Sequence, residues 1–92
     1  MAGEEAHPPS LDAVKETLRR LVVEVSALDP ARIVDSSTLD EDIQLSSIAF
    51  VELQVAVENA FGIEVDPVEV VERNSFGAVA DLIWEKTRLL AC

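Results

Sequence analysis

Apolar residues recur every three or four positions in the first patterned stretch of the chain, which begins after Ser10. This spacing places them on one face of an α-helix. Ser10 is a suitable N-cap, and the Asp29-Pro30 pair is expected to end the helix. The pattern therefore predicts a core-building helix whose buried face is formed by Leu11, Val14, Leu18, Leu21, Val22 and Val25.

The longest apolar run predicts a second helix, which ends at Gly62. Ser46 or Ser47 can serve as its N-cap, and a glycine suits the position just beyond a helix C-terminus. At about 100° per residue, one face of this helix gathers apolar side chains that are expected to join the core. These are Phe50, Leu53, Val57, Ala60 and Phe61.

Three more apolar residues, Ile48, Val51 and Val55, fall on the opposite side of that helix, beside the carboxylates of Glu52 and Glu58. A helix with two apolar stripes is either enclosed between two layers or exposes one stripe to a partner. A chain of 92 residues has little core with which to cover such a helix on both sides. We therefore expect the second stripe to be an exposed contact surface for other proteins.

A short third helix is predicted over Pro67–Arg73, because Asp66 can cap it and proline is favoured at the first helical position. Its β-branched residues lower the intrinsic helix propensity, so its stability must come from packing. The apolar contacts are expected from Val68, Val70 and Val71.

The last helix is expected over Phe76–Leu89, with Ser75 as its N-cap. Glycine and proline are scarce, and no strand-like alternation persists along the chain. The predicted fold class is therefore all-α: a four-helix bundle with three longer helices, a short third helix and a long connection between the first two. Apolar anchors are expected to hold that connection on the core, namely Ile33, Val34, Leu39, Ile43 and Leu45.

Residues 1–9 are predicted to be a disordered leader, because they mix glutamate, proline and small residues, and residues 10–90 to form a single domain. The leader lacks the apolar core of a secretory signal, and no apolar run approaches membrane-spanning length. The single cysteine, Cys92, cannot form an internal disulfide and suits a reducing cytosol. We expect a cytoplasmic monomer that does not associate with membranes.

The net charge of −11 is unevenly distributed along the chain. All seven Lys and Arg residues lie outside Ile33–Glu72, and that interval holds ten of the eighteen acids. Such a surface repels phosphates and disfavours nucleic-acid binding. An acidic field attracts basic protein surfaces instead, which favours protein partners.

Residues suited to catalysis or metal binding are scarce. Asp40, Glu41 and Asp42 are adjacent but lack the spacing of a calcium loop, and one Cys with one His does not support a zinc site. A catalytic Ser47 would need a neighbouring base, and the only histidine, His7, lies in the predicted leader. We therefore expect neither an enzyme nor a metal site.

The segment Asp42–Val65 resembles the acyl carrier protein family, as does the start of the last predicted helix. That family has a serine followed by Leu or Ile at the start of its second helix, then V-E-L and, at the end of the helix, F-G-I. The resemblance runs from about Leu11 to Leu90 without an obvious insertion. The residues that carry it are Ser47-Ile48, Val51-Glu52-Leu53, Phe61-Gly62-Ile63-Glu64 and Ser75-Phe76-Gly77-Ala78-Val79.

The resemblance implies that Ser47 carries a 4′-phosphopantetheine arm, attached from coenzyme A by a phosphopantetheinyl transferase. The thiol of the arm would hold acyl or aminoacyl groups as thioesters and pass them between enzymes. Acyl- or aminoacyl-loading enzymes, synthases and transferases with basic docking surfaces are the implied partners. By position in the family pattern, the residues that contact them are Ile48, Val51, Glu52, Val55 and Glu58.

Two positions depart from the family pattern. Ser46 replaces the Asp that usually precedes the modified serine, and Ala49 stands where fatty-acid carriers often have a second acid. Ser46 is thus an alternative attachment residue, although the aliphatic Ile48 must follow the serine and favours Ser47. The departures favour polyketide, nonribosomal peptide or other specialised biosynthesis over fatty-acid synthesis. The competing hypothesis is an unmodified acidic helical module that binds proteins through the apolar stripe alone.

Overall fold

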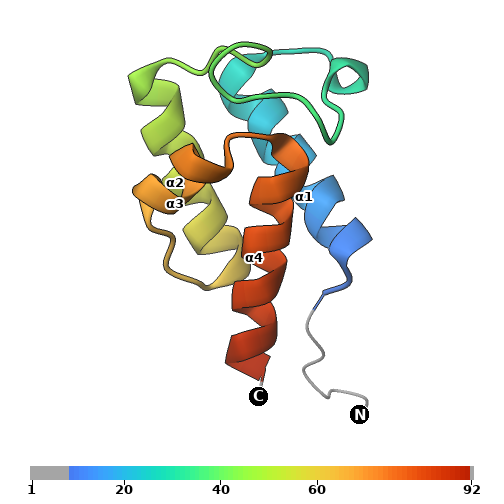
Figure 1. Ribbon diagram of the computed structural model, residues 1–92, viewed down its shortest axis with the longest axis vertical. Coiled ribbons are helices and arrows are strands. Elements are labelled where there is room, and N and C mark those ends of the chain that lie inside the picture. The colour runs from blue at the N-terminus through green and yellow to red at the C-terminus, as the bar shows by residue number, and fades with distance from the viewer. Residues whose placement is uncertain (1–8, 92) are drawn as a thin grey trace.

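The computed structural model describes residues 9–91 and is shown in Figure 1. Within this range there is no β-strand, only an isolated bridge between Thr38 and Ser75. The predicted all-α bundle, with a short third helix and a long first connection, is confirmed. Residues 1–8 of the predicted leader, which include His7, lie outside the described residues, as does Cys92. The elements are α1 (Leu11–Ser26), the 3₁₀ helix η1 (Pro30–Arg32), α2 (Ser47–Phe61), α3 (Pro67–Arg73) and α4 (Phe76–Ala91).

The helix α1 packs against both α2 and α4, and the short α3 packs against α4 (Figure 1). The core between them is closely filled. Val14 and Phe76 are completely buried, and Leu18 and Ile83 are 1% exposed. Because burial of apolar surface is the main favourable contribution to folding, these residues of α1 and α4 hold the other elements in place.

The predicted core face of α2 is largely correct. Leu53 and Val57 are buried, and Phe50 and Phe61 are half-buried against the core. Ala60 is exposed, contrary to the prediction. The neighbouring Phe61 packs against the core at this last turn, which leaves the small Ala60 side chain in solvent.

The first helix ends three residues before the Asp29-Pro30 pair, so the predicted terminator was wrong. Ala27 is the C-cap instead: it adopts a left-handed conformation with φ 61°, and its N–H donates to the Val23 carbonyl oxygen. The Ser26 hydroxyl donates to the Val22 carbonyl oxygen (2.6 Å) in the last turn. Asp29 caps the 3₁₀ helix η1, where Pro30 is the first residue. An Asp-Pro pair is a start signal as well as a stop signal, and here it acts as a start.

Four of the five predicted anchors hold the connection between α1 and α2 on the core. Ile33, Leu39 and Ile43 are buried, and Leu45 packs against them. Val34 is 52% exposed, so its prediction as an anchor was wrong. Ile33 has an extended backbone, and in extended chain successive side chains point to opposite sides.

Backbone hydrogen bonds tie this connection to the start of α4. The Phe76 N–H donates to the Ser37 carbonyl (2.7 Å), and the Gly77 N–H donates to the Asp35 carbonyl (2.9 Å). The approach is so close that a Cβ at Gly77 would lie 3.0 Å from the Asp35 Cβ. These bonds hold the connection, residues 27–46, across the end of the bundle at which α2 starts (Figure 1). We call this connection the strap.

An ion pair adds a tie from this strap to α1: the Lys15 Nζ lies 2.9 Å from the Asp35 Oδ2. The hydrogen bond to Asp35 raises the pKa of Lys15 above its ordinary value of 10.5, with the charge of Asp35 adding to the effect. A lysine pKa raised by folding contributes stability that is fully present below the ordinary pKa. That contribution is lost as the pH rises through the folded-state pKa, so the tie is intact at neutral pH.

Only one of the three valines predicted to pack α3 is buried. Val70 is 6% exposed, whereas Val68 and Val71 are 60% and 61% exposed, which corrects the prediction. Residues at successive 100° steps of a helix cannot all face one neighbour. With Val70 toward the core, Val68 points almost directly away from it and Val71 points to the side.

Replacing Gly62 with alanine is expected to lower the free energy of unfolding by about 1–2 kcal/mol. Gly62 ends α2 in the left-handed region, with φ 67°, and no heavy atom lies within 4 Å of a Cβ built there. The cost is therefore conformational rather than steric. Urea denaturation measures it, and Gly62→Asn is the matched control because asparagine tolerates this region better. Equal stability of the wild type and Gly62→Ala would contradict the assignment of Gly62 to the left-handed region.

Candidate functional site

Two adjacent serines begin α2, and they have different structural roles. Ser46 is the N-cap: its hydroxyl oxygen accepts a hydrogen bond from the Ala49 N–H (3.1 Å), and its carbonyl accepts one from Phe50 N–H (2.8 Å). Gln44, two residues earlier, has φ 59°, a left-handed conformation that is uncommon for a residue other than glycine. This turn leads the chain from the strap into the helix.

Ser47 is the first residue of α2, and its side chain is exposed. Within residues 9–91, its hydroxyl makes no hydrogen bond to another residue. The first N–H groups of a helix have no intrahelical acceptor and form the positive end of the helix dipole. An anionic group attached at Ser47 would therefore be stabilised by about 0.3–1 kcal/mol.

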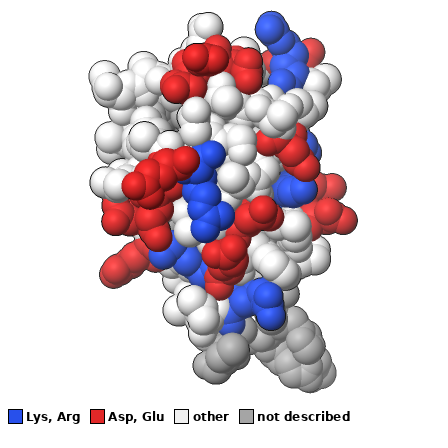
Figure 2. All heavy atoms as spheres, in the orientation of Figure 1, with Lys and Arg blue, Asp and Glu red and all other residues white. Residues whose placement is uncertain are grey.

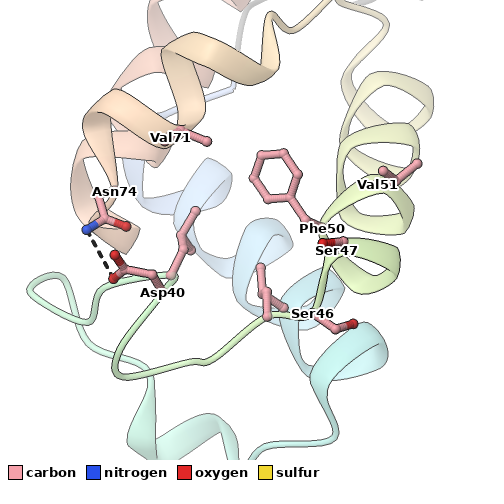
Figure 3. Close-up of a pocket in the computed structure, with 9 residues that line it drawn as sticks. Asp40, Ser46, Ser47, Phe50, Val51, Val71 and Asn74 are labelled. Atoms are coloured by element: carbon pink, nitrogen blue, oxygen red, sulfur yellow. Dashed lines mark hydrogen bonds between the residues drawn. The ribbon is translucent and has the colours of Figure 1, made fainter.

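A cavity of about 370 Å³ opens beside these serines, between α2, α3 and the strap (Figure 3). In the view of Figure 3, Ser46 and Ser47 lie on one side of it, and Asp40 and Asn74 lie opposite them. Phe50 points into the space between the two sides. The apolar residues that line the cavity are Leu39, Leu45, Phe50, Val51 and Val71.

The predicted second stripe of α2 is exposed rather than enclosed. Ile48 is 74% exposed, Val51 56% and Val55 50%, and Glu52 is exposed beside them. Glu58 differs from the other four predicted contact residues, because it is half-buried. Four of the five predicted contact residues therefore lie on an accessible face.

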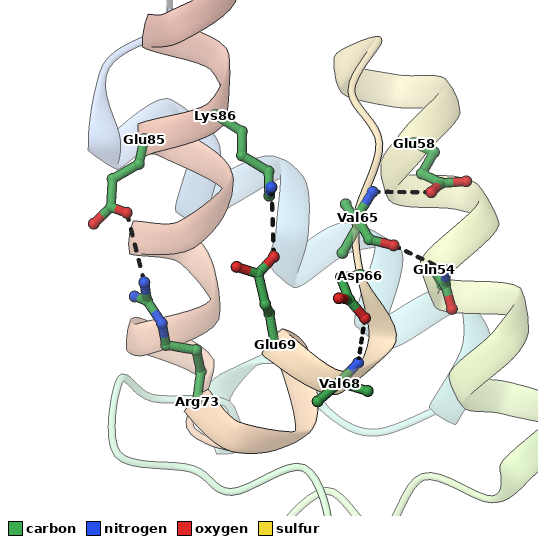
Figure 4. Close-up of polar contacts among 9 residues, drawn as sticks. All are labelled: Gln54, Glu58, Val65, Asp66, Val68, Glu69, Arg73, Glu85 and Lys86. Carbon is green, nitrogen blue, oxygen red and sulfur yellow. Dashed lines mark hydrogen bonds and ion pairs between the residues drawn. The ribbon is translucent and has the colours of Figure 1, made fainter.

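Glu58 is also engaged within its own chain. Its Oε2 accepts a hydrogen bond from the Val65 N–H (3.0 Å), and the Gln54 Nε2 donates to the Val65 carbonyl (3.1 Å), as Figure 4 shows. These two bonds tie the segment before α3 to α2. On the other side of α3, ion pairs of 3.5 Å join Lys86 to Glu69 and Arg73 to Glu85, so α3 is held from both sides.

Sequence reasoning did not find Asp40, Val71 and Asn74 as residues beside the serines. They share a cavity with Ser47 because the strap and α3 lie beside the start of α2, an arrangement that is not visible in the sequence. One local signal was available for Asn74: it directly follows a predicted helix, where a left-handed residue is common, and its φ is 61°. Val71 was interpreted as a core residue, and its exposure is what leaves it free to line the cavity.

The face shown in Figure 2 carries charged side chains of both signs. In Figure 2 the area where α2 begins, at upper left, is uncharged, and the Lys and Arg side chains lie elsewhere on this face. Among residues 9–91, no three His, Cys, Asp or Glu side chains are placed to hold a metal ion. No helix in that range is long and apolar enough to span a lipid bilayer.

Comparison with known proteins adds an independent finding. The family described as "Phosphopantetheine attachment site" matches residues 16–83. Polyketide-8 synthase acyl carrier protein 2 of Streptomyces avermitilis is 31% identical over 72 residues, which cover 78% of this chain and 83% of the relative. The acyl carrier protein of Thermosynechococcus vestitus is 29% identical over 79% of this chain and 90% of its own length. That of Zymomonas mobilis is 31% identical over 74% of this chain and 83% of its own length.

Proposed function

The chain belongs to the acyl carrier protein family, and we propose that Ser47 is the residue to which its phosphopantetheine arm is attached. Members of this family are carriers rather than enzymes, and their cofactor is 4′-phosphopantetheine. The observation that carries the proposal is the exposed Ser47 hydroxyl at the first position of α2, which is free of hydrogen bonds to the rest of residues 9–91.

The residues around Ser47 fit this cofactor. The hydroxyl oxygen would be esterified to the phosphate, and the unpaired N–H groups of the first turn of α2 would face the charge. The arm supplies a terminal thiol that holds cargo as a thioester. Ser46 is the weaker candidate for attachment, because its oxygen already accepts the Ala49 N–H and modification would disturb the cap.

Partner enzymes are proposed to dock on the exposed face of α2. Ile48, Val51 and Val55 provide the apolar area, and Glu52 provides charge that would attract a basic enzyme surface. The phosphopantetheinyl transferase, the loading enzyme and the synthases would use this same face in turn. Glu58 is part of the proposal, although its bond to Val65 limits its freedom to reach a partner.

We place the carrier in specialised biosynthesis, with polyketide or nonribosomal peptide assembly in the cytoplasm as the proposed setting. The Ser46 and Ala49 departures from the family pattern support this choice. So does the similarity to the Streptomyces relative, which is named as an acyl carrier protein of a polyketide synthase.

The attachment is tested by incubating the purified apo protein with coenzyme A and a broad-specificity phosphopantetheinyl transferase. Intact mass spectrometry is expected to show a gain of one phosphopantetheine group, and peptide fragmentation to place it on Ser47. A folded protein without any mass gain would contradict the proposal. It would favour the unmodified interaction module, which needs only the exposed apolar stripe.

Val51→Asp is expected to reduce kcat/KM of the transferase for this protein about tenfold, the effect of removing one central contact of an interface. The free energy of unfolding is expected to change by less than about 0.5 kcal/mol, because Val51 is more than half exposed. Transferase kinetics and urea denaturation provide the two measurements.

The matched control is Val34→Asp, which introduces the same charge at a residue of similar exposure on the strap. It is expected to leave the kinetics unchanged. A loss of more than about 2 kcal/mol in Val51→Asp would show that Val51 is a core residue. Equal kinetics of Val51→Asp and the wild type would remove this residue from the docking face.

A further inference from the structure

Within residues 9–91, four residues adopt a left-handed backbone conformation with φ between 59° and 67°: Ala27, Gln44, Gly62 and Asn74. Three of them end helices, because Ala27, Gly62 and Asn74 are the C-caps of α1, α2 and α3. A left-handed cap lets the backbone pair carbonyl groups that a helix end leaves without a partner. Gln44 ends no helix, so its conformation needs another explanation.

The two neighbours of Gln44 are fixed on the core. The Ile43 N–H donates to the Thr38 carbonyl (2.8 Å), and the Ile43 side chain is buried. The Leu45 N–H donates to the Leu39 carbonyl (3.1 Å), and Leu45 packs against the core. A left-handed conformation is unfavourable for any residue with a Cβ, and glycine would form the same turn without that cost. The turn alone therefore does not account for a glutamine at this position.

The side chain of Gln44 is exposed, and it makes no hydrogen bond to another residue of the described range. Asn74, the other left-handed residue with an amide side chain, uses its amide within the fold, where its Nδ2 donates to the Asp40 Oδ1 (3.2 Å; Figure 3). A primary amide has two N–H donors and a carbonyl acceptor. On Gln44 these groups are available to a binding partner.

Gln44 also lies close to the attachment residue. Three residues of fully extended chain span at most about 11 Å, so the Cα atoms of Gln44 and Ser47 lie within that distance of each other. An interface of standard size covers about 800 Å² of each partner, which corresponds to a circle of roughly 16 Å radius. An enzyme centred on the Ser47 hydroxyl therefore covers Gln44 on the strap as well as the exposed stripe of α2.

We propose, on the basis of attachment at Ser47, that Gln44 is a specificity-determining contact for the phosphopantetheinyl transferase. Its amide donates one hydrogen bond to, and accepts another from, a peptide group or an amide side chain of the enzyme. This contact is neutral, so it differs in kind from the attraction between Glu52 and a basic surface. The unfavourable backbone conformation is retained because it comes with an exposed amide beside the modified serine.

Gln44→Ala tests the amide and keeps a Cβ, and Ala27 shows that alanine adopts the same conformation in this chain. The kcat/KM of the transferase is expected to fall about fivefold, mainly through KM, which is the effect of one lost hydrogen bond. The ratio to the wild-type value is expected to be the same at low and at high salt. For Glu52→Ala that ratio should approach one at high salt, because ions screen exposed charges. The urea midpoint of Gln44→Ala should equal that of the wild type.

Gln44→Gly removes the amide and the unfavourable conformation together. Its urea midpoint is expected to rise by roughly 0.5 M, while kcat/KM falls by the same factor as in Gln44→Ala. Ala27→Gly is the matched control, because it relieves the same conformation at the end of α1. It is expected to raise the midpoint similarly and to keep the wild-type kinetics. A more stable protein that is a poorer substrate is thus the expected signature of Gln44→Gly.

Wild-type kinetics in Gln44→Ala would overturn the contact. A lowered urea midpoint in Gln44→Ala would also overturn it, by showing a structural role for the side chain. So would an equal fall of kcat/KM in Ala27→Gly, which would trace the effect to backbone flexibility. Each of these results leaves attachment intact, provided that peptide fragmentation finds the group on Ser47. A wild-type protein that is not modified at Ser47 overturns the attachment proposal and the contact with it.

Discussion

Ser47→Ala is expected to abolish attachment of the phosphopantetheine group completely. Alanine has no oxygen with which to form the phosphodiester, and the hydroxyl of Ser46 is held at the cap by the Ala49 N–H. The variant should remain folded, because the exposed Ser47 hydroxyl makes no hydrogen bond to another residue of the described range. Intact mass after incubation with coenzyme A and the transferase is the measurement.

Two substitutions of Ser46 serve as controls, and both are expected to retain the mass gain. Ser46→Ala removes the cap and should lower the free energy of unfolding by about 1 kcal/mol. Ser46→Asp keeps a capping oxygen and should be close to the wild type in stability. If Ser47→Ala gains mass and Ser46→Asp does not, then Ser46 is the attachment residue. In that case the alignment of this sequence with the family pattern is shifted by one residue.

Phe76→Ala is expected to lower the free energy of unfolding by about 3–5 kcal/mol, the largest loss of stability that we predict for a single substitution. Phe76 is completely buried, and its N–H donates to the Ser37 carbonyl of the strap. The guanidinium carbon of Arg19 lies 5.2 Å from the centre of the ring. Removing the ring leaves a cavity where α1, α4 and the strap meet.

Urea denaturation followed by circular dichroism measures this loss. A domain of this size has a total stability of about 5–15 kcal/mol, so the variant is expected to be marginal at 37 °C. Val68→Ala is the control, because Val68 is 60% exposed and its truncation should cost less than about 0.5 kcal/mol. A loss below about 1 kcal/mol in Phe76→Ala would contradict the packing at this junction.

Helix positions were predictable because their causes are local. Caps, proline at a first helical position and apolar spacing of three or four act between residues less than two turns apart. Pro67–Arg73 was predicted with its observed bounds, and Phe76–Leu89 with an end two residues short. The other wrong helix end, that of α1 at Ser26, depended on two alternatives of equal local merit: an Asp-Pro pair can stop a helix or start one.

The exposed position of Ser47 and the exposed stripe of α2 were predictable for a similar reason. Periodicity alone separates Ile48, Val51 and Val55 from the core face, and the short chain leaves no second layer to cover them. The family pattern adds which serine of the pair to choose. The structure gives that choice a physical basis, because Ser46 occupies the cap and leaves Ser47 outward.

The sequence by itself determined the order of the four α-helices, the serine pair at the start of α2 and the acidic interval around it. Only the tertiary structure decided which valines of α3 face solvent, which anchor of the strap turns outward and which residues share a cavity with Ser47. The reason is that burial at Val34 or Val71 depends on whether a distant segment lies over it. The meeting of Asp40 and Asn74, 34 positions apart, depends likewise on the strap crossing the junction between α3 and α4.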